Sequence, residues 1–304
     1  MVKSFIVNIP SKHIVRFGKL LGKLLYVVDA PHRRIVHRNL QFTHPEWSTF
    51  YIQQSSKRIF QNLVIAILEI FQMSFYSCDD YFGRIRLVGE EHLYSALKKN
   101  KGLIIFSAHL GNWEVGLQYL TCLLNLPITG VAKKMRLKPL DRWVTQSRSR
   151  FGVRIIEKKG AFSEMMQTLR RGEILALLID QSKSSEGIIV KFFDKLVRTT
   201  PAVAMLAIRC KSPVLPMFCA RAEDGQLTIF VEPPLAIQRT RDLRSDLTQN
   251  TQMMTSMVEK AVRKYSDQWL WLHKRWKTHY PLLYPGYLDR RRQRNEKKKQ
   301  RLQS

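Results

Sequence analysis

The strongest constraint in this sequence is a regular alternation of strand and helix patterns that begins at Arg84. Short apolar segments predict strands over residues 85–88, 103–107, 128–132, 153–156 and 174–179. The stretches between them have the spacing of amphipathic helices, at 90–99, 111–124, 139–151 and 162–170. Such alternation is typical of an α/β fold in which helices flank a mainly parallel sheet. Further on, the Asp224-Gly225 turn predicts a β-hairpin near the edge of the sheet, followed by a last helix over 243–265.

The first 80 residues contain helical patterns only. A helix is predicted over residues 11–28, with Ser11 as its cap and with a strip of positive side chains opposite an apolar face: Lys12, Arg16, Lys19 and Lys23. Such a basic amphipathic helix can lie in a membrane interface, or it can be an ordinary surface helix packed on the domain. We favour membrane contact, because the charges on this strip are all positive.

A second apolar pattern runs from Glu46 to Tyr76 and predicts a long helix or a broken pair of helices. Its wide apolar face can belong to the core or line a groove for an acyl chain, and we favour the core. We therefore divide the chain into an N-terminal membrane-associating helical region (1–80), an α/β core (81–288) and a basic disordered tail (289–304).

Composition limits the partners and the compartment. Lys and Arg total 51 against 24 Asp and Glu, and the formal net charge of +27 favours an anionic partner such as a phospholipid surface, a nucleic acid or an acidic protein. The sequence contains neither an apolar run of about 18 residues nor a signal peptide, so we expect no membrane span and no export. The four cysteines form no Cys-x-x-Cys motif, and we expect reduced thiols at Cys78, Cys122, Cys210 and Cys219.

The segment LIIFSAHLGNWEVG, residues 103–116, carries the candidate chemistry. It predicts a buried strand, a turn that contains His109 and a helix that opens at residues 111–113. Glu114 lies five residues after His109, and across a strand-to-helix corner the two side chains can face each other. The pair is then interpreted as a general base and the carboxylate that orients it. The alternative is a turn histidine beside a glutamate that only favours the start of a helix.

The sequence SAHLGNWE, residues 107–114, resembles the His-x4-Glu motif of the bacterial lipid A late acyltransferases, a branch of the lysophospholipid acyltransferase superfamily. Further segments agree with this family in order and spacing: RLVGEEHLYSALKKNKG, LLIDQ at 177–181, FFDKLVRTTPAVAMLAIRCKSPVLP at 192–216 and QWLWLHKRWKTH at 268–279. The resemblance extends over nearly the whole chain up to His279 and is far more specific than the dyad alone.

The resemblance implies transfer of a fatty acyl group from an acyl carrier protein thioester, or from acyl-CoA, to a hydroxyl of a phosphorylated lipid A precursor. In this reading His109 is the base and Glu114 orients it, without a metal or a bound cofactor. The implied location is the cytoplasmic face of the inner membrane. Because the hydrophobic N-terminal segment of the family is not evident here, we expect a peripheral or monotopic enzyme. A related acyltransferase for phospholipid or mannosylated lipid would share the dyad.

Two further residues are candidates for the site. An arginine in the region after residue 138 is implicated in the family's activity, and Arg148 matches it best, with Arg150 as the alternative. A guanidinium there can bind a lipid phosphate or a developing oxyanion, whereas a solvated basic face is the simpler interpretation. Asp180 ends an apolar strand and is expected to point toward the same rim as His109, where the family has an acidic residue; otherwise it is a loop cap.

Aromatic and cationic residues alternate near the C-terminus, at Trp269, Trp271, His273, Lys274, Arg275 and Trp276. Such residues prefer a membrane interface, or they stack on single-stranded nucleic acid, and the resemblance favours the membrane.

A nucleic-acid-binding protein would explain the charge but not the buried strand that ends at His109. A lipid esterase is disfavoured because the chain has no Gly-x-Ser-x-Gly nucleophile motif.

Overall fold

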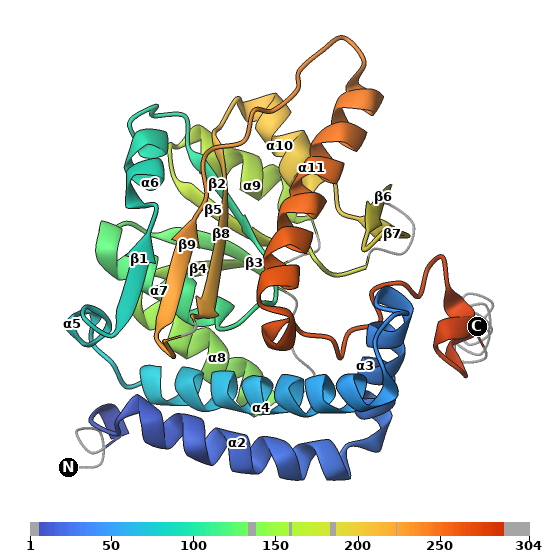
Figure 1. Cartoon of the computed structure of the whole chain (residues 1–304). Coiled ribbons are helices and arrows are strands. Elements are labelled where there is room, and N and C mark those ends of the chain that lie inside the picture. Colours follow the sequence, from blue (N-terminus) through green and yellow to red (C-terminus); the bar gives the residue numbers. More distant parts are fainter. Residues whose placement is uncertain (1–5, 133–137, 158–159, 183–186, 223, 289–304) are drawn as a thin grey trace, which may run out of the picture.

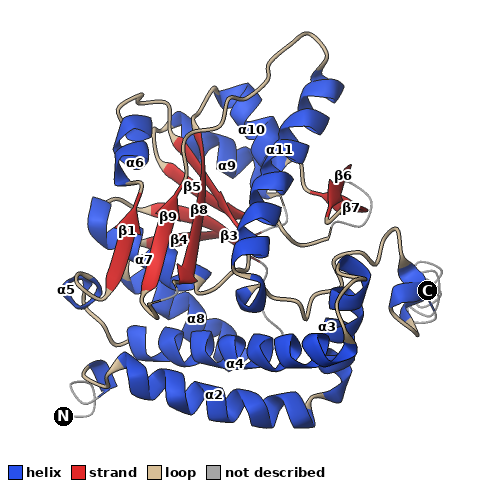
Figure 2. Cartoon of the chain, viewed as in Figure 1, coloured by secondary structure: helices blue, strands red, loops and turns tan. Residues whose placement is uncertain are grey.

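The centre of the molecule is a seven-stranded sheet in the order β1-β9-β8-β2-β5-β3-β4 (Figures 1 and 2). This computed structural model describes residues 6–132, 138–157, 160–182, 187–222 and 224–288. The strands of the sheet are β1 (Ile85–Val88), β2 (Leu103–Ser107), β3 (Ile128–Ala132), β4 (Val153–Glu157), β5 (Ile174–Leu178), β8 (Val214–Arg221) and β9 (Leu227–Val231). Every neighbouring pair is parallel except the β8–β9 hairpin, so the predicted mainly parallel α/β sheet is confirmed.

Helices cover both faces of this sheet (Figure 2). Their bounds are α6 (Glu90–Leu97), α7 (Trp113–Leu124), α8 (Lys138–Arg150), α9 (Ala161–Arg170), α10 (Ala202–Cys210) and α11 (Leu243–Lys264). Successive side chains of a strand point to opposite faces, and β2 shows this clearly. Ile104 and Phe106 pack with α9, α10 and α11, whereas Leu103 and Ile105 pack with α6 and α7. Because both faces are buried, β2 is apolar from Leu103 to Phe106.

A short antiparallel hairpin, β6 (Ile188–Phe192) and β7 (Lys195–Thr199), lies outside the main sheet. The strand and helix alternation did not predict it. Its two-residue turn consists of Phe193 and Asp194, which have φ values of 53° and 57°. Hairpin turns of this kind normally contain glycine or asparagine, and here neither residue is present to give that signal.

Three long helices precede the sheet: α2 (Ser11–Val28), α3 (Ala30–Thr43) and α4 (Thr49–Met73). α3 and α4 contribute Val36, Leu40 and Phe60 to the same apolar core as β2. The prediction of a helix over residues 11–28 is confirmed, but Ser11 does not cap it. The helix follows Pro10 and has no side-chain capping hydrogen bond.

α2 lies alongside α4 (Figure 1) and contacts it through two buried glycines. A Cβ atom added to Gly22 would come within 2.4 Å of Gln61 Cα, and one added to Gly18 within 2.5 Å of Ile65 Cγ1. Because the small residues face α4, several large apolar side chains of α2 are turned outward, while Leu25 and Tyr26 pack against the core. The exposed ones are Phe17, Leu20, Leu24, Val27 and Val28, each at least 53% accessible. Among the residues described, no helix is long and apolar enough to cross a membrane.

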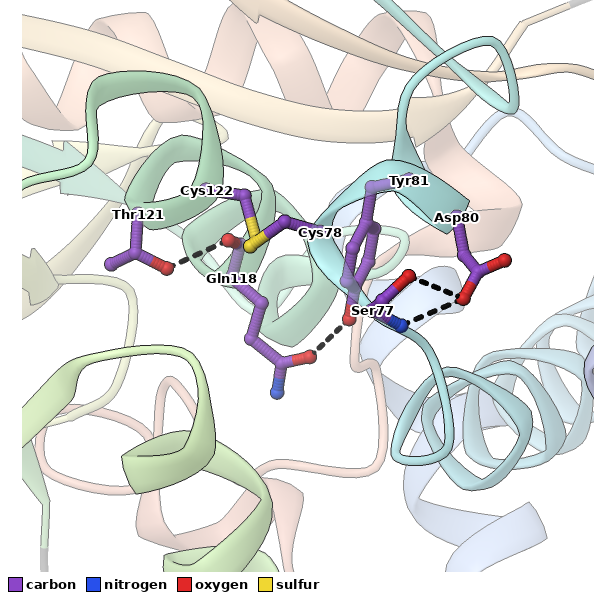
Figure 3. The surroundings of a disulfide bond; sticks show 7 residues. All are labelled: Ser77, Cys78, Asp80, Tyr81, Gln118, Thr121 and Cys122. Atoms are coloured by element: carbon purple, nitrogen blue, oxygen red, sulfur yellow. Dashed lines mark hydrogen bonds between the residues drawn. A yellow bond between two sulfur atoms is a disulfide. The ribbon is translucent and has the colours of Figure 1, made fainter. Parts of the chain in front are cut away.

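The prediction that all four cysteines are reduced is wrong for two of them. Cys78 and Cys122 form a disulfide, with sulfur atoms 2.06 Å apart (Figure 3). The short helix α5 (Cys78–Tyr81) packs against α7, where the Tyr81 hydroxyl donates to Gln118 Oε1 over 2.6 Å. This contact brings together two cysteines 44 residues apart, which no local motif could indicate. Cys210 and Cys219 are free thiols, as expected.

The disulfide should contribute measurably to stability. Closing a loop of about 44 residues is expected to stabilise the folded state by up to about 4 kcal/mol. Cys122→Ser should therefore lower the free energy of unfolding by up to that amount in urea titrations without reductant. Cys210→Ser, which removes a free thiol, is the control. Equal stability of Cys122→Ser and the oxidised wild type would contradict this contribution.

Candidate active site

His109 lies on the turn between β2 and α7, at the edge where the parallel strands end. The turn is fixed by its own sequence. Gly111 has a φ of +56°, and a Cβ atom there would lie 2.2 Å from Cys219 O. Asn112 caps α7 by accepting from Val115 N over 3.4 Å, and its backbone N–H donates to Cys219 O over 2.9 Å. A glycine followed by an asparagine is thus required for the chain to turn this sharply into the helix.

Asp180 is the direct partner of His109. It follows β5, which pairs in parallel with β2, so the two residues emerge side by side at one edge of the sheet. His109 Nδ1 is 2.8 Å from Asp180 Oδ1, and the His109 backbone N–H donates to Oδ2 over 2.9 Å. Gln181 Nε2 donates to His109 Nε2 over 3.2 Å. The imidazole therefore carries its proton on Nδ1 and presents a lone pair at Nε2.

The expected hydrogen bond between Glu114 and His109 is not formed, and this part of the prediction is corrected. Glu114 is the second residue of α7, and its side chain turns toward α8, where both carboxylate oxygens accept from Arg148. The bond from Arg148 Nε to Glu114 Oε2 is 2.8 Å long. Trp113 Nε1 also donates to Glu114, over 3.2 Å. Asp180 occupies the position beside Nδ1 because its strand adjoins the strand of His109.

Of the two arginines considered, Arg148 is the one that lies at the site. It forms the bidentate pair with Glu114, and its side chain is 16% exposed. Arg150 points elsewhere and donates to Ser74 O over 2.6 Å. The prediction that Asp180 points to the rim of His109 is confirmed by their hydrogen bonds. The catalytic roles of these residues remain predictions.

Burial and charge act together on the His109–Asp180 pair. Burial alone would lower the pKa of His109, but the charge and the hydrogen bond of Asp180 outweigh it and raise this pKa above its usual value. Burial would likewise raise the pKa of Asp180, and the facing imidazole with the other donors lowers it instead. Asp180 is therefore ionised at neutral pH, and it stabilises a proton on His109.

A C-terminal segment whose residues are buried or half-buried, 266–280, backs the turn, and we call it the strap. Trp269, Trp271 and Trp276 are each at most 2% exposed, so the expectation that these residues lie in a membrane interface is wrong. Their rings pack against one another and against Phe192. A pattern of alternating aromatic and cationic residues does not reveal whether the rings face solvent or the core, and here they face the core.

An apolar pocket with a cavity volume of about 70 Å³ opens beside this site. Glu114, Arg148 and Trp113 line it, together with Ile105, Leu117, Gly130, Ile155, Leu177 and Met217. The ring of Trp113 also meets the His109 imidazole edge to face, with ring centres 5.0 Å apart. A largely apolar cavity with a few convergent polar groups is typical of a site for a small or chain-like ligand. Among the described residues, no group of three or more His, Cys, Asp or Glu could hold a metal ion.

Sequence patterns assigned neither Gln181 nor Trp269 to this site, although both contact the central pair. Gln181 directly follows Asp180, and Trp269 donates its indole N–H to Asp180 Oδ2 over 2.8 Å. Both lie in segments that matched the family pattern, LLIDQ and QWLWLHKRWKTH. That match was the one available signal, since Trp269 is 89 residues from Asp180 in the chain.

The electrostatic assignment can be tested on the free protein. In Asp180→Asn the carboxylate charge is lost while burial remains, so the pKa of His109 should fall from above 6.5 to below it. The measurement is an NMR titration of the imidazole resonances. Glu114→Gln is the control, because Glu114 raises this pKa less than Asp180 does. A larger downward shift in Glu114→Gln than in Asp180→Asn would reverse the assignment.

Comparison with known proteins identifies relatives over most of the chain. A sequence profile of the family described as bacterial lipid A biosynthesis acyltransferase matches residues 1–278. A lipid A biosynthesis lauroyltransferase of Escherichia coli (strain K12) is 26% identical over 278 residues, which cover 90% of this chain and 88% of that protein. A lipid A biosynthesis acyltransferase of Haemophilus influenzae is 24% identical over 84% of this chain and 79% of that protein. A phosphatidylinositol mannoside acyltransferase of Mycolicibacterium smegmatis is 24% identical over 64% of this chain and 62% of that protein.

Proposed function

Since this chain belongs to the bacterial lipid A biosynthesis acyltransferase family and is thus an acyltransferase, we propose that it transfers a fatty acyl group from a carrier thioester to a hydroxyl of a phosphorylated glycolipid, a lipid A precursor. The observation that carries the mechanism is the His109–Asp180 pair, which leaves Nε2 of the imidazole as the proton acceptor; in the structure this atom accepts a hydrogen bond from Gln181. The named activities of the Escherichia coli and Haemophilus influenzae relatives support this acceptor.

In the proposed reaction, His109 Nε2 accepts the proton of the acceptor hydroxyl as the oxygen attacks the thioester carbonyl carbon. The carbon–sulfur bond then breaks, and the leaving thiolate takes the proton from the imidazolium. The products are an ester and a free thiol. Asp180 stabilises the imidazolium between these two steps, as the carboxylate of a catalytic triad does. Glu114 keeps Arg148 in place, and the guanidinium stabilises the oxyanion that forms on the carbonyl.

The apolar pocket beside Glu114 and Arg148 suits the acyl chain of the donor. Its lining is mostly apolar, and Glu114 and Arg148 are among its few polar groups. The donor that best fits a chain of net charge +27 is an acyl carrier protein, which is acidic, with acyl-CoA as the second choice. A mannosylated lipid is the second candidate acceptor, because a phosphatidylinositol mannoside acyltransferase is among the relatives.

The role of the base is tested by His109→Gln. Loss of general-base catalysis should lower kcat by about 10²- to 10⁴-fold while the melting temperature stays near that of the wild type. Acyl transfer from a carrier protein thioester to a lipid A precursor is measured by mass spectrometry. His92→Gln, which changes a histidine of α6, serves as the control. Near-normal transfer by His109→Gln would exclude His109 as the base.

We also propose that residues 1–80 associate with the cytoplasmic face of the inner membrane, through α2. The outward apolar side chains of this helix include Leu20 and Leu24, which are 64% and 59% exposed. Lysines of the same helix, Lys12, Lys19 and Lys23, are exposed as well. A helix that presents apolar and cationic side chains to solvent has the composition of an interfacial helix on an anionic bilayer.

The membrane proposal predicts that Leu20→Asp/Leu24→Asp weakens binding to vesicles that contain phosphatidylglycerol by more than about tenfold, because burying one leucine contributes about 1.5–3 kcal/mol. Sedimentation with the vesicles measures the bound fraction. Leu282→Asp is the matched control, since Leu282 is 84% exposed but belongs to the C-terminal segment. Equal binding of the double variant and the control would show that α2 is not the contact.

A further inference from the structure

The two oxygens of the Asp180 carboxylate have different partners. Oδ2 accepts from the backbone N–H of His109 over 2.9 Å and from the indole N–H of Trp269 over 2.8 Å. Oδ1 is thereby left for His109 Nδ1, at 2.8 Å. Asp180 is 4% exposed, so these donors take the place of water around its charge. The rotation of the carboxylate therefore depends on both bonds to Oδ2, and one of them comes from the strap.

Trp269 is in turn fixed against the turn that carries His109. The backbone N–H of Gly111 donates to Gln268 O over 2.9 Å, and that of Leu270 donates to His109 O over 3.0 Å. Leu110 and Trp269 form an antiparallel bridge between these two bonds. The backbone of Trp269 is thus tied to the turn, while its side chain reaches the carboxylate that faces the imidazole.

The strap itself is held from α3. Asn39 is fully buried, and its Nδ2 donates to Trp271 O over 2.7 Å and to His273 O over 3.0 Å. The hydroxyl of Tyr284 donates to Asn39 Oδ1 over 2.6 Å. These bonds fix the backbone on the C-terminal side of Trp269. The indole is consequently held by packing, by the turn and by α3, and it has little freedom to leave Asp180.

We propose that Trp269 is a positioning residue of the acyltransferase: its indole N–H fixes the rotation of the Asp180 carboxylate, so that Oδ1 faces the imidazole and Nε2 of His109 points toward the acceptor hydroxyl. This inference rests on the proposed function, in which His109 is the base. It adds a third member to the pair, from a segment that the His-x4-Glu motif does not contain. Trp269 touches neither substrate nor reacting atoms, and acts through Asp180.

Trp271 offers a matched comparison within the same segment. It is also a fully buried tryptophan, and its ring centre is 4.8 Å from that of Trp269. Its indole N–H donates to a backbone carbonyl, Ser266 O, over 2.7 Å, and not to the catalytic pair. Replacing either tryptophan by phenylalanine removes one buried indole and one hydrogen bond. Only the change at residue 269 removes a donor from Asp180.

The pH dependence of the reaction distinguishes positioning from simple loss of packing. The charged or titratable groups around His109 and its partner come from three directions: Asp180 after β5, Glu114 and Arg148 on α7 and α8, and His273, Arg275 and Lys277 on the strap. None of these is changed by Trp269→Phe. Without the indole donor the Asp180 carboxylate can rotate, and its contact with His109 Nδ1, which raises the pKa of the imidazole, is weakened. The acidic limb of the pH profile of kcat should therefore move to lower pH.

The experiment compares the full chain with Trp269→Phe and Trp271→Phe, using a carrier protein thioester and a lipid A precursor. For Trp269→Phe we expect kcat to fall by about 10- to 100-fold, with both KM values within about threefold of the wild type. The acidic limb of the pH profile should shift to lower pH. Trp271→Phe should keep the wild-type limb and most of kcat, at a similar loss of melting temperature. Site-specific replacement of the indole of residue 269 by a benzothiophene, which keeps the shape but lacks the N–H, should reproduce the effect of Trp269→Phe.

The outcomes separate this inference from the proposed function. If His109→Gln is inactive but the residue 269 variants behave like Trp271→Phe, the positioning role of Trp269 is overturned and the base is retained. If the benzothiophene variant keeps the wild-type kcat and pH profile, the N–H has no role and the inference also fails. If His109→Gln transfers acyl groups normally, the proposed function itself fails.

Discussion

The structure of the site depends on one buried carboxylate. An ionised group removed from water is costly unless donors surround it, and Asp180 obtains its donors from two segments that are distant from it in the sequence. The imidazole and backbone of His109 come from the turn after β2, the indole of Trp269 comes from the strap, and Asp180 itself follows β5. The order of strands in the sheet makes this possible, because β2 and β5 are parallel neighbours and end at one edge. The same arrangement orients the imidazole, so the groups that satisfy the buried charge are also those that set the direction of Nε2, the proposed proton acceptor.

A second buried charge connects the N-terminal helices to the same turn. Glu69 of α4 is 5% exposed; burial raises its pKa, and the charge of Arg221 on β8 acts in the opposite direction. Arg221 donates to Glu69, and Asn112, the cap of α7, donates to its other oxygen over 3.1 Å. Removing one partner of a buried ion pair leaves the other charge uncompensated, so α4, β8 and the turn are constrained together. Helix α4 is thus part of the framework that places His109, although the sequence pattern assigned it to a separate N-terminal helical region.

Sequence patterns predicted what depends on local periodicity and missed what depends on contacts between distant segments. The strands and helices of the sheet region followed from alternation, and His109 and Asp180 were selected because both follow buried strands. The partner of His109 was assigned to Glu114 because that residue is close in sequence, whereas the neighbouring strand supplies a carboxylate 71 residues away. The β6–β7 turn lacks glycine and asparagine, and the Cys78–Cys122 bond joins two helices, so neither had a local signal. The tryptophans of the strap have the composition of an interfacial segment, and only their burial shows that they belong to the core.

The position of α4 also relates the proposed membrane surface to the chemistry. On one side α4 contacts α2 through Gly18 and Gly22 of α2. On the other side it contacts the strap, where Asn62 Nδ2 of α4 donates to Asp267 O over 3.0 Å. It also contacts the turn, where Asn112 Nδ2 donates to Glu69 of α4 over 3.1 Å. Packed helices lie about 8–10 Å apart, so a bilayer beneath α2 would be separated from the turn by little more than two helix layers. An amphiphilic acceptor has its acyl chains in the bilayer and its hydroxyl groups at the surface. In the proposed arrangement, a base held one helix beyond an interfacial helix, with Ile67 and Phe71 of α4 exposed to solvent, suits such a substrate.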